Sequence, residues 1–136
     1  RLFSARLYIY EPVQYTPIHD HNSWGVYGCV SEKIEVIRYR RQDDETRQGY
    51  AELHETERVI LHPGDTSVVQ PLNDGIHRAG NPATGTCVML CVYGTPIRRL
   101  YVNEYDHIRN SVRRRYPPRL RKKRLAGQAL DCMRAI

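Results

Sequence analysis

The stretch Thr16–Val30, TPIHDHNSWGVYGCV, decides the fold, because it places two histidines one residue apart directly before an apolar run. In an extended chain, side chains at positions i and i+2 point to the same side. His19 and His21 therefore project together from the entry to a strand, an arrangement that suits two neutral imidazoles binding one transition metal. The pair alone leaves an alternative open, because solvent-facing histidines at this spacing also occur by chance.

Short apolar runs separated by turn signals extend in both directions from this stretch. Prolines, glycines and the polar loop at residues 41–49 provide the turn signals, and no βαβ period is visible. Short strands with turns at intervals of about 8–12 residues predict an all-β sandwich or barrel. We expect strands at residues 5–10, 24–30, 33–40, 57–61, 66–70, 74–80, 86–94 and 98–102.

A second histidine-bearing segment, PGDTSVVQPLNDGIHRAGN at residues 63–81, narrows this fold class. Its Pro-Gly-Asp turn, strand, proline, glycine and final H-x-x-x-N resemble the second sequence motif of cupins. The stretch around His19 and His21 resembles their first motif, H-x-H followed by a strand and a glycine. The resemblance spans roughly residues 7–97 and implies a double-stranded β-helix, the cupin jelly-roll barrel.

The cupin resemblance implies that His19, His21 and His77 surround one metal ion. Many cupins add a glutamate four or five residues after the second histidine, but Gly25 and Val26 stand there in this chain. We therefore expect three neutral imidazoles, which leave the charge of a divalent ion uncompensated and favour anionic ligands. Fe(II) is the expected ion, with nickel, zinc and manganese as alternatives, because geometry and supply rather than affinity choose the metal.

Within the cupins, IHDHNSWGVYG, IHRAGNP and a later VYG are similar to the cysteine dioxygenase and mercaptopropionate dioxygenase group and its small bacterial relatives. This resemblance implies a non-haem iron(II) dioxygenase that binds a small thiol and adds both atoms of O₂ to its sulfur, forming a sulfinate. It also implies that Tyr93 is the catalytic tyrosine and that Tyr10 lines the pocket. Trp24 and Cys91 are further candidates for the substrate pocket.

Several positions depart from the pattern of that group. The histidine and serine that precede its tyrosine are Cys91 and Met89 here, and the cysteine that some members cross-link to the tyrosine is Val26. The arginine that binds the substrate carboxylate corresponds here to residues 1–6 at most. Two alternatives therefore stay open: a three-histidine cupin that acts on a non-thiol anionic substrate, and a non-catalytic sensor of a small ligand.

Basic residues are concentrated towards the C-terminal end. Residues 98–136 hold twelve Lys and Arg against three Asp and Glu, whereas residues 1–97 hold nine against twelve. We divide the chain into a cupin barrel at 1–105 and a basic, partly helical extension at 106–136. Clustered cations attract phosphates, but no nucleic-acid-reading motif accompanies them. A solvated or subunit-bridging segment is therefore favoured over a nucleic-acid-binding one.

The composition and the apolar runs limit the other classes of protein to which the chain could belong. The four cysteines lack paired spacing, so buried, reduced thiols are expected. The longest apolar run, VMLCVY, is far shorter than the ~20 residues of a membrane span. No charged-then-apolar leader opens the sequence. We expect a cytoplasmic protein without a membrane partner, a small-molecule substrate with O₂, and a homodimer suggested by the family resemblance. The other histidines, His54, His62 and His107, are expected in turns or solvent.

Overall fold

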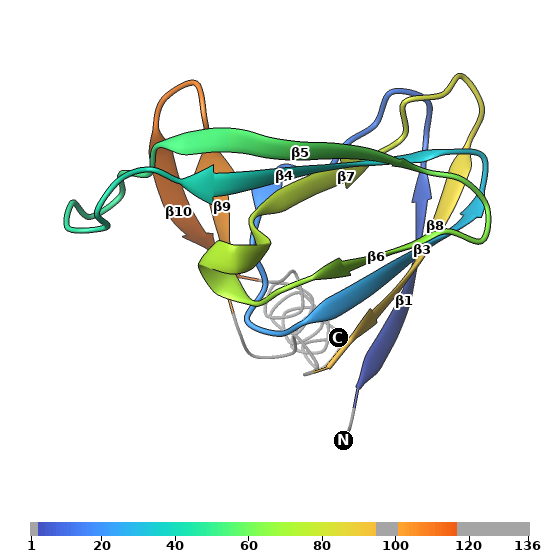
Figure 1. The fold of residues 1–136 in the computed structure, drawn as a ribbon, viewed down its shortest axis with the longest axis horizontal. Helices are drawn as coiled ribbons and strands as arrows, with labels where there is room; N and C mark the ends of the chain where they lie inside the picture. The colour runs from blue at the N-terminus through green and yellow to red at the C-terminus, as the bar shows by residue number, and fades with distance from the viewer. Residues whose placement is uncertain (1–2, 95–100, 117–136) are drawn as a thin grey trace, which may run out of the picture.

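The computed structural model describes residues 3–94 and 101–116. Ten strands and one short 3₁₀ helix make up this part of the chain (Figure 1). They are β1 (Ser4–Tyr10), β2 (Ile18–His19), β3 (Gly25–Ser31), β4 (Ile34–Arg41), β5 (Leu53–Leu61), β6 (Thr66–Val69), η1 (Leu72–Gly75), β7 (His77–Gly80), β8 (Cys87–Tyr93), β9 (Val102–Asp106) and β10 (Ser111–Arg115). The predicted all-β class is confirmed.

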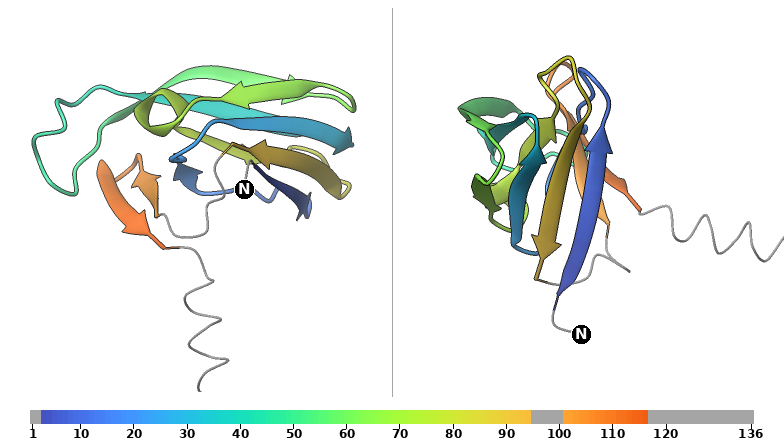
Figure 2. Two further views of the ribbon diagram at one scale, coloured as in Figure 1. Left: turned by 90° about the horizontal axis from the view of Figure 1, so that it is seen from below. Right: turned by 90° about the vertical axis from the view of Figure 1, so that its right-hand side faces the viewer.

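The strands form two antiparallel sheets that face each other (Figure 2). One sheet has four strands in the order β1-β8-β3-β6, and the other has six in the order β10-β9-β2-β7-β4-β5. The chain passes repeatedly from one sheet to the other, so strands that are neighbours in a sheet are mostly distant in sequence. This double-stranded β-helix is the predicted jelly-roll barrel.

Alternation of side chains gives the four-stranded sheet two different faces. Along β8, buried residues alternate with less buried ones, as the period of two requires. On the inner face Tyr93 lies opposite Gly25, and Cys91 lies opposite Tyr27. The outer face exposes large apolar side chains, among them Leu7, Ile9, Val68 and Leu90. The homodimer stays a prediction, for which this face offers an apolar surface.

Two hydrophobic clusters fill the interior, one on each side of the short strands β2 and β7. The larger cluster includes Tyr10, Tyr27 and Tyr93 together with the thiols Cys29, Cys87 and Cys91. These three cysteines are free and buried, as predicted, and Cys132 lies outside the described residues. The smaller cluster contains Ile18, Ile37, Tyr39, Ala51, Ile76 and Tyr105. The segment that carries the paired histidines thus separates two cores.

The division into a barrel at 1–105 and an extension at 106–136 stays a prediction. Across this boundary β9 continues to Asp106, and β10 pairs with it along its whole length. Ser111 also forms a bridge to Tyr50, which fastens β10 to the body. Part of the expected basic extension is therefore sheet. The helix expected within 119–135 lies outside the described residues, as does most of the strand expected at 98–102.

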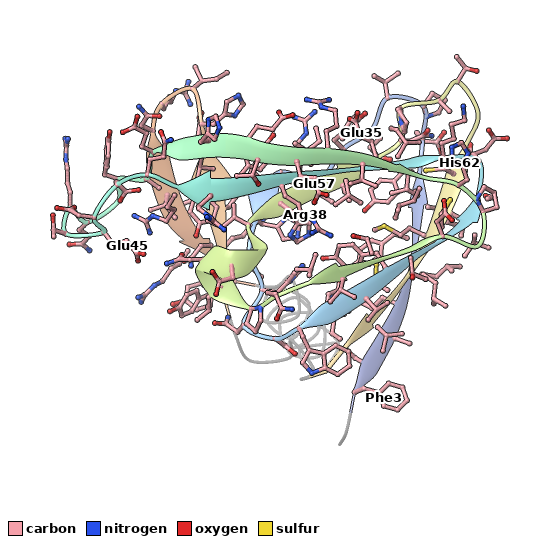
Figure 3. All side chains as sticks on the ribbon, viewed as in Figure 1. Phe3, Glu35, Arg38, Glu45, Glu57 and His62 are labelled. Atoms are coloured by element: carbon pink, nitrogen blue, oxygen red, sulfur yellow. The ribbon has the colours of Figure 1, made fainter. Side chains whose placement is uncertain are left out.

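The three remaining histidines lie in exposed positions, as predicted. His54, His62 and His107 are all exposed. His62 lies at the turn that joins β5 to β6, where its backbone amide donates to the Asp65 carboxylate (2.9 Å) (Figure 3). Arg38 and Glu57 form an ion pair across β4 and β5 at 3.1 Å. No helix in the described ranges has the length and hydrophobicity that a membrane span requires.

Candidate metal centre

Three histidines converge at the seam between β2 and β7. His19 and His77 are direct partners in the antiparallel register of these strands. His21 follows β2 by two residues, and its ring lies 4.7 Å from that of His19 and 5.2 Å from that of His77, between centroids. One ring nitrogen from each histidine lies within 4.8 Å of the other two. The structure therefore brings together the three residues predicted as metal ligands.

Backbone carbonyls fix two of these imidazoles. The Nδ1 atom of His19 donates to the Pro17 carbonyl at 2.8 Å, and that of His77 donates to the Gly75 carbonyl at 2.7 Å. A carbonyl acceptor behind Nδ1 leaves Nε2 with its lone pair free, which is the tautomer a metal requires. Gly75 is needed here, since a Cβ on it would lie 1.7 Å from the Gln70 carbonyl oxygen. The tight turn of η1 thus orients His77.

His21 is held differently, and one of its ring nitrogens is unsatisfied. Its Nε2 atom lies 3.0 Å from the hydroxyl of Tyr27, whereas its buried Nδ1 atom has no hydrogen-bond partner. Buried polar atoms without partners are rare because each one costs about 1–3 kcal/mol. The exception at His21 indicates a site built for a ligand that supplies the missing interaction.

Asp20, between the two histidines, points to the opposite side and is fully bonded. Its carboxylate accepts from the Asn103 backbone amide (2.9 Å), the Asn103 side chain (2.7 Å) and the Tyr105 hydroxyl (3.1 Å). Only 1% of the Asp20 residue surface is exposed. This network fastens the segment 18–21 to β9, so that both flanking imidazoles are held towards the interior of the barrel.

Burial keeps the three imidazoles neutral. It lowers the pKa of His19, and it lowers the pKa of His77 well below the ordinary value of 6.5. The pKa of His21 falls to about 3, again chiefly through burial and secondarily through the neighbouring His19. Neutral imidazoles with free lone pairs are the form in which histidine binds metals. The cluster is therefore ready to bind a cation at neutral pH.

The histidines open onto a cavity of about 300 Å³. Of the predicted pocket residues, Tyr10 and Tyr93 line it, and the Tyr93 ring lies 5.0 Å from that of His21. Met89 also lines it, at the position where the dioxygenase group has serine. Cys91 is completely buried behind the lining, where burial raises its pKa to about 12. Cys91 therefore lies beside Tyr93 but outside the cavity lining.

Trp24, the remaining candidate for the substrate pocket, lies outside the cavity lining formed by the described residues. The residue is 46% exposed. Its indole instead lies against Gly94, where an added Cβ would approach the Trp24 Nε1 atom to 2.3 Å. The backbone amide of Gly94 donates to the Trp24 carbonyl at 3.1 Å. Trp24 thus covers the end of β8.

Tyr27 is the site residue that sequence reasoning missed. Its hydroxyl lies 2.7 Å from His77 Nε2 and 3.0 Å from His21 Nε2, and only 1% of the residue is exposed. Burial raises the pKa of its phenol well above the ordinary value. The signal was present, since Tyr27 lies two residues from Gly25 on β3 and so shares the inward face. We read that run only as a barrel strand.

Charged groups at the cavity differ in how they are paired. Both oxygens of Glu104 are occupied, one by Arg113 and one by Arg115, each at 2.7 Å. Burial acts to raise the pKa of Glu104, but these bonds to Arg113 and Arg115 hold it below the ordinary value. Arg6 also lines the cavity, 5.9 Å from the Tyr93 ring centroid. No carboxylate in the described ranges pairs with Arg6.

Comparison with known proteins supports the fold class alone. No family model matches the chain, and no curated protein matches it by sequence. Solved structures do resemble it. A Cupin 2 conserved barrel domain protein from Salinispora arenicola has 17% identity and a TM-score of 0.51, and the match covers 70% of this chain and 65% of that one.

Two further structures give the same result. A protein from Thermus thermophilus has 21% identity and a TM-score of 0.51, with 68% of this chain and 72% of that one covered. A sugar phosphate isomerase of the cupin superfamily from Silicibacter pomeroyi has 14% identity and a TM-score of 0.53, with 85% and 68% covered. The fold is therefore a double-stranded β-helix of the cupin type, and it carries a three-histidine group that can hold a metal.

Proposed function

We propose that this protein is a non-haem iron(II) dioxygenase that oxidises a small anionic thiol to a sulfinate. The observation that carries the proposal is the convergence of His19, His21 and His77 without a carboxylate beside them. Among the described residues, these three alone form a group with metal-ligand spacing. Glu104 is near, but both of its oxygens are bound to arginines. The three histidines are thus the metal-binding set of this site.

The three imidazoles would hold Fe(II) through one ring nitrogen each. Bound Fe(II) supplies a Lewis acid that deprotonates a coordinated thiol and a redox centre for O₂. Because the imidazoles are neutral, they do not cancel the charge of a divalent ion, and an anionic substrate is attracted. Both atoms of O₂ end on the substrate sulfur, so the reaction needs no further reductant.

Arg6 would bind the anionic end of the substrate. Its guanidinium lines the cavity and has no carboxylate partner in the described chain, in contrast to Arg115, which Glu104 occupies. A carboxylate matches the fork of an arginine and binds it in two hydrogen bonds. Arg6 lies on β1, within the segment where the cysteine dioxygenase resemblance leaves room for the substrate arginine. We infer that Arg6 selects thiols that carry a carboxylate.

Tyr93 would donate a hydrogen bond to the reacting oxygen. Its ring lies beside that of His21, and only 3% of the residue is exposed. Burial raises the pKa of the Tyr93 phenol strongly, so the hydroxyl keeps its proton and serves as a donor. A fixed donor in a water-poor site stabilises charge that develops during a reaction by several kcal/mol in favourable cases.

An oxygen electrode tests this proposal directly. Protein loaded with Fe(II) is expected to consume O₂ with mercaptopropionate or cysteine and to form the sulfinate, which mass spectrometry identifies. Cysteamine, which lacks a carboxylate, is expected to be a poorer substrate, and Arg6→Gln is expected to remove that preference. The absence of O₂ uptake with every thiol, while metal is bound, would reject the thiol dioxygenase.

One observation favours a second candidate, a metal-dependent cupin enzyme that acts on an anionic non-thiol. Met89 lines the cavity and Cys91 lies behind it, so the relay of serine and histidine that supports the tyrosine in thiol dioxygenases is missing. The same metal-loaded protein, offered enolates and catechol-like chelators, would distinguish this candidate. Turnover of such an anion with no thiol oxidation would establish it.

A further inference from the structure

We propose that the phenol oxygen of Tyr27 is a fourth ligand of the metal that His19, His21 and His77 hold. The inference rests on the metal site of the proposed function and adds a residue that the resemblance did not suggest. Tyr27 comes from β3 of the four-stranded sheet, whereas the histidines come from the six-stranded sheet and the loop after β2. The ion would therefore join the two walls of the barrel.

Distances carry the argument. Neighbouring ligands bound at about 2.1 Å in a six-coordinate site lie about 3.0 Å apart. The Tyr27 oxygen lies 3.0 Å from His21 Nε2 and 2.7 Å from His77 Nε2, close to that spacing. These distances are also those of hydrogen bonds, so the assignment as a ligand depends on the two partners, which both belong to the predicted metal-ligand set. The Tyr27 oxygen is spaced from each of them as one ligand of an ion is from its neighbour.

The protons at this point are compatible with a bound cation. His77 donates its Nδ1 proton to the Gly75 carbonyl, so its Nε2 atom carries a lone pair that faces the Tyr27 oxygen. A cation bound to this lone pair, to His21 Nε2 and to the phenol oxygen would replace the phenol proton that lies between Tyr27 and His77. The phenol proton leaves to solvent as the oxygen binds.

The limited space beside Gly25 explains why a tyrosine, rather than a glutamate, would supply the fourth ligand. Many cupins have a carboxylate ligand at or next to Gly25, but a Cβ there would lie 3.1 Å from the Tyr93 ring and 3.4 Å from the Tyr27 ring. The two tyrosine rings thus occupy the space that a glutamate side chain would need. Tyr27 replaces that carboxylate with a phenolate, which lowers the net charge of a divalent site to +1 and leaves two coordination positions free on a six-coordinate ion.

Optical spectroscopy tests this inference without reference to turnover. Protein loaded with Fe(II) and oxidised to Fe(III) is expected to show the visible phenolate-to-iron(III) charge-transfer band, with resonance-enhanced tyrosine ring vibrations. Tyr27→Phe is expected to abolish the band and to lower affinity for Co(II) by at least the roughly 10–100-fold known for groups that lie behind a metal ligand. Tyr93→Phe, its matched neighbour in the same cavity, is expected to keep the band.

The outcomes separate this inference from the proposed function. Stoichiometric binding of Co(II) without a phenolate band in the iron(III) protein would overturn the Tyr27 ligand and leave the three-histidine site standing. Failure to bind Co(II) at all would overturn both. If Tyr27→Phe does not fold, the other four tyrosines that line the cavity, Tyr8, Tyr10, Tyr93 and Tyr116, are each changed to phenylalanine. Persistence of the band in all four variants identifies Tyr27 by exclusion, and loss of the band in any one of them would overturn Tyr27.

Discussion

The two sides of the segment 18–21 consist of neighbouring residues but differ in their hydrogen bonding. Asp20 faces the smaller core with its carboxylate bound by three donors, whereas His21 faces the cavity with Nδ1 unsatisfied. Both residues are buried, 1% and 4% exposed. Burial is therefore not what distinguishes them. On the structural side of this segment, the hydrogen bonds of Asp20 are complete. On the side that can bind a ligand, one nitrogen of His21 has no hydrogen bond.

The largest expected effect comes from removing a histidine on the cavity side. His77→Ala is expected to abolish stoichiometric binding of a divalent metal, a larger loss than the 10–100-fold caused by removing a group behind a ligand. Calorimetric titration with Co(II) measures it. The exposed His107→Ala is the matched control and should bind normally. Equal binding by the two variants would contradict the three-histidine site.

On the opposite side, Asp20→Ala is expected to affect folding. The change leaves the Tyr105 hydroxyl and the Asn103 amides without their acceptor, so the free energy of unfolding should fall by about 3 kcal/mol. Urea denaturation of the metal-free protein measures this loss, and Asp20→Asn should lose less because one carbonyl acceptor remains. If Asp20→Ala were as stable as the wild type but bound metal more weakly, Asp20 would belong to the metal site and not to the structural side.

Tyr93→Phe removes a donor at the cavity without removing a ligand. If Tyr93 supplies a hydrogen bond to the reacting oxygen, kcat/KM for the thiol should fall by up to about 100-fold, while metal affinity stays constant. Steady-state O₂ uptake and Co(II) titration measure the two quantities separately. A parallel fall in both would show that Tyr93 holds the site together rather than assisting the reaction.

The smallest expected effect is at Asp43, a second carboxylate that, like Asp20, accepts several hydrogen bonds. Asp43 accepts bonds from Arg41 and from the backbone amides of Glu45 and Glu52, and the bonds to Arg41 contribute most to lowering its pKa from 3.8 to about 2. Because the folded-state pKa lies below the unfolded one, this stabilisation is present above about pH 4 and is lost as the pH falls through about 2.

Asp43→Asn should therefore lower the free energy of unfolding by about 1 kcal/mol at pH 7, with no difference from the wild type below pH 2. Urea denaturation across this range measures the difference. The exposed Asp74→Asn serves as the control and should match the wild type throughout. A difference that persisted unchanged into acid would show that charge at Asp43 is not its source.

The barrel and its histidines were predictable because their signals are local. Period-two alternation and Pro-Gly turns set the strands, and His19, His21 and His77 stand in motifs with fixed spacing. The position of Tyr27 was only partly predictable. The period of two places its side chain on the inward face, but its distance from His21 and His77 depends on how the two sheets face each other. The exposure of Trp24 depended likewise on the neighbouring Gly94, and the extent of the barrel depended on the pairing of β10.

Pairing between β2 and β9 also has a consequence for the order in which the molecule is made. Asp20 is fastened by Asn103 and Tyr105, which follow it by 83 and 85 positions. A ribosome delivers these partners only after the four-stranded sheet has emerged. The two imidazoles that flank Asp20 thus acquire their fixed orientation only after β9 has been synthesised. Capture of an ion by the nascent polypeptide at these imidazoles would wait for the same strand.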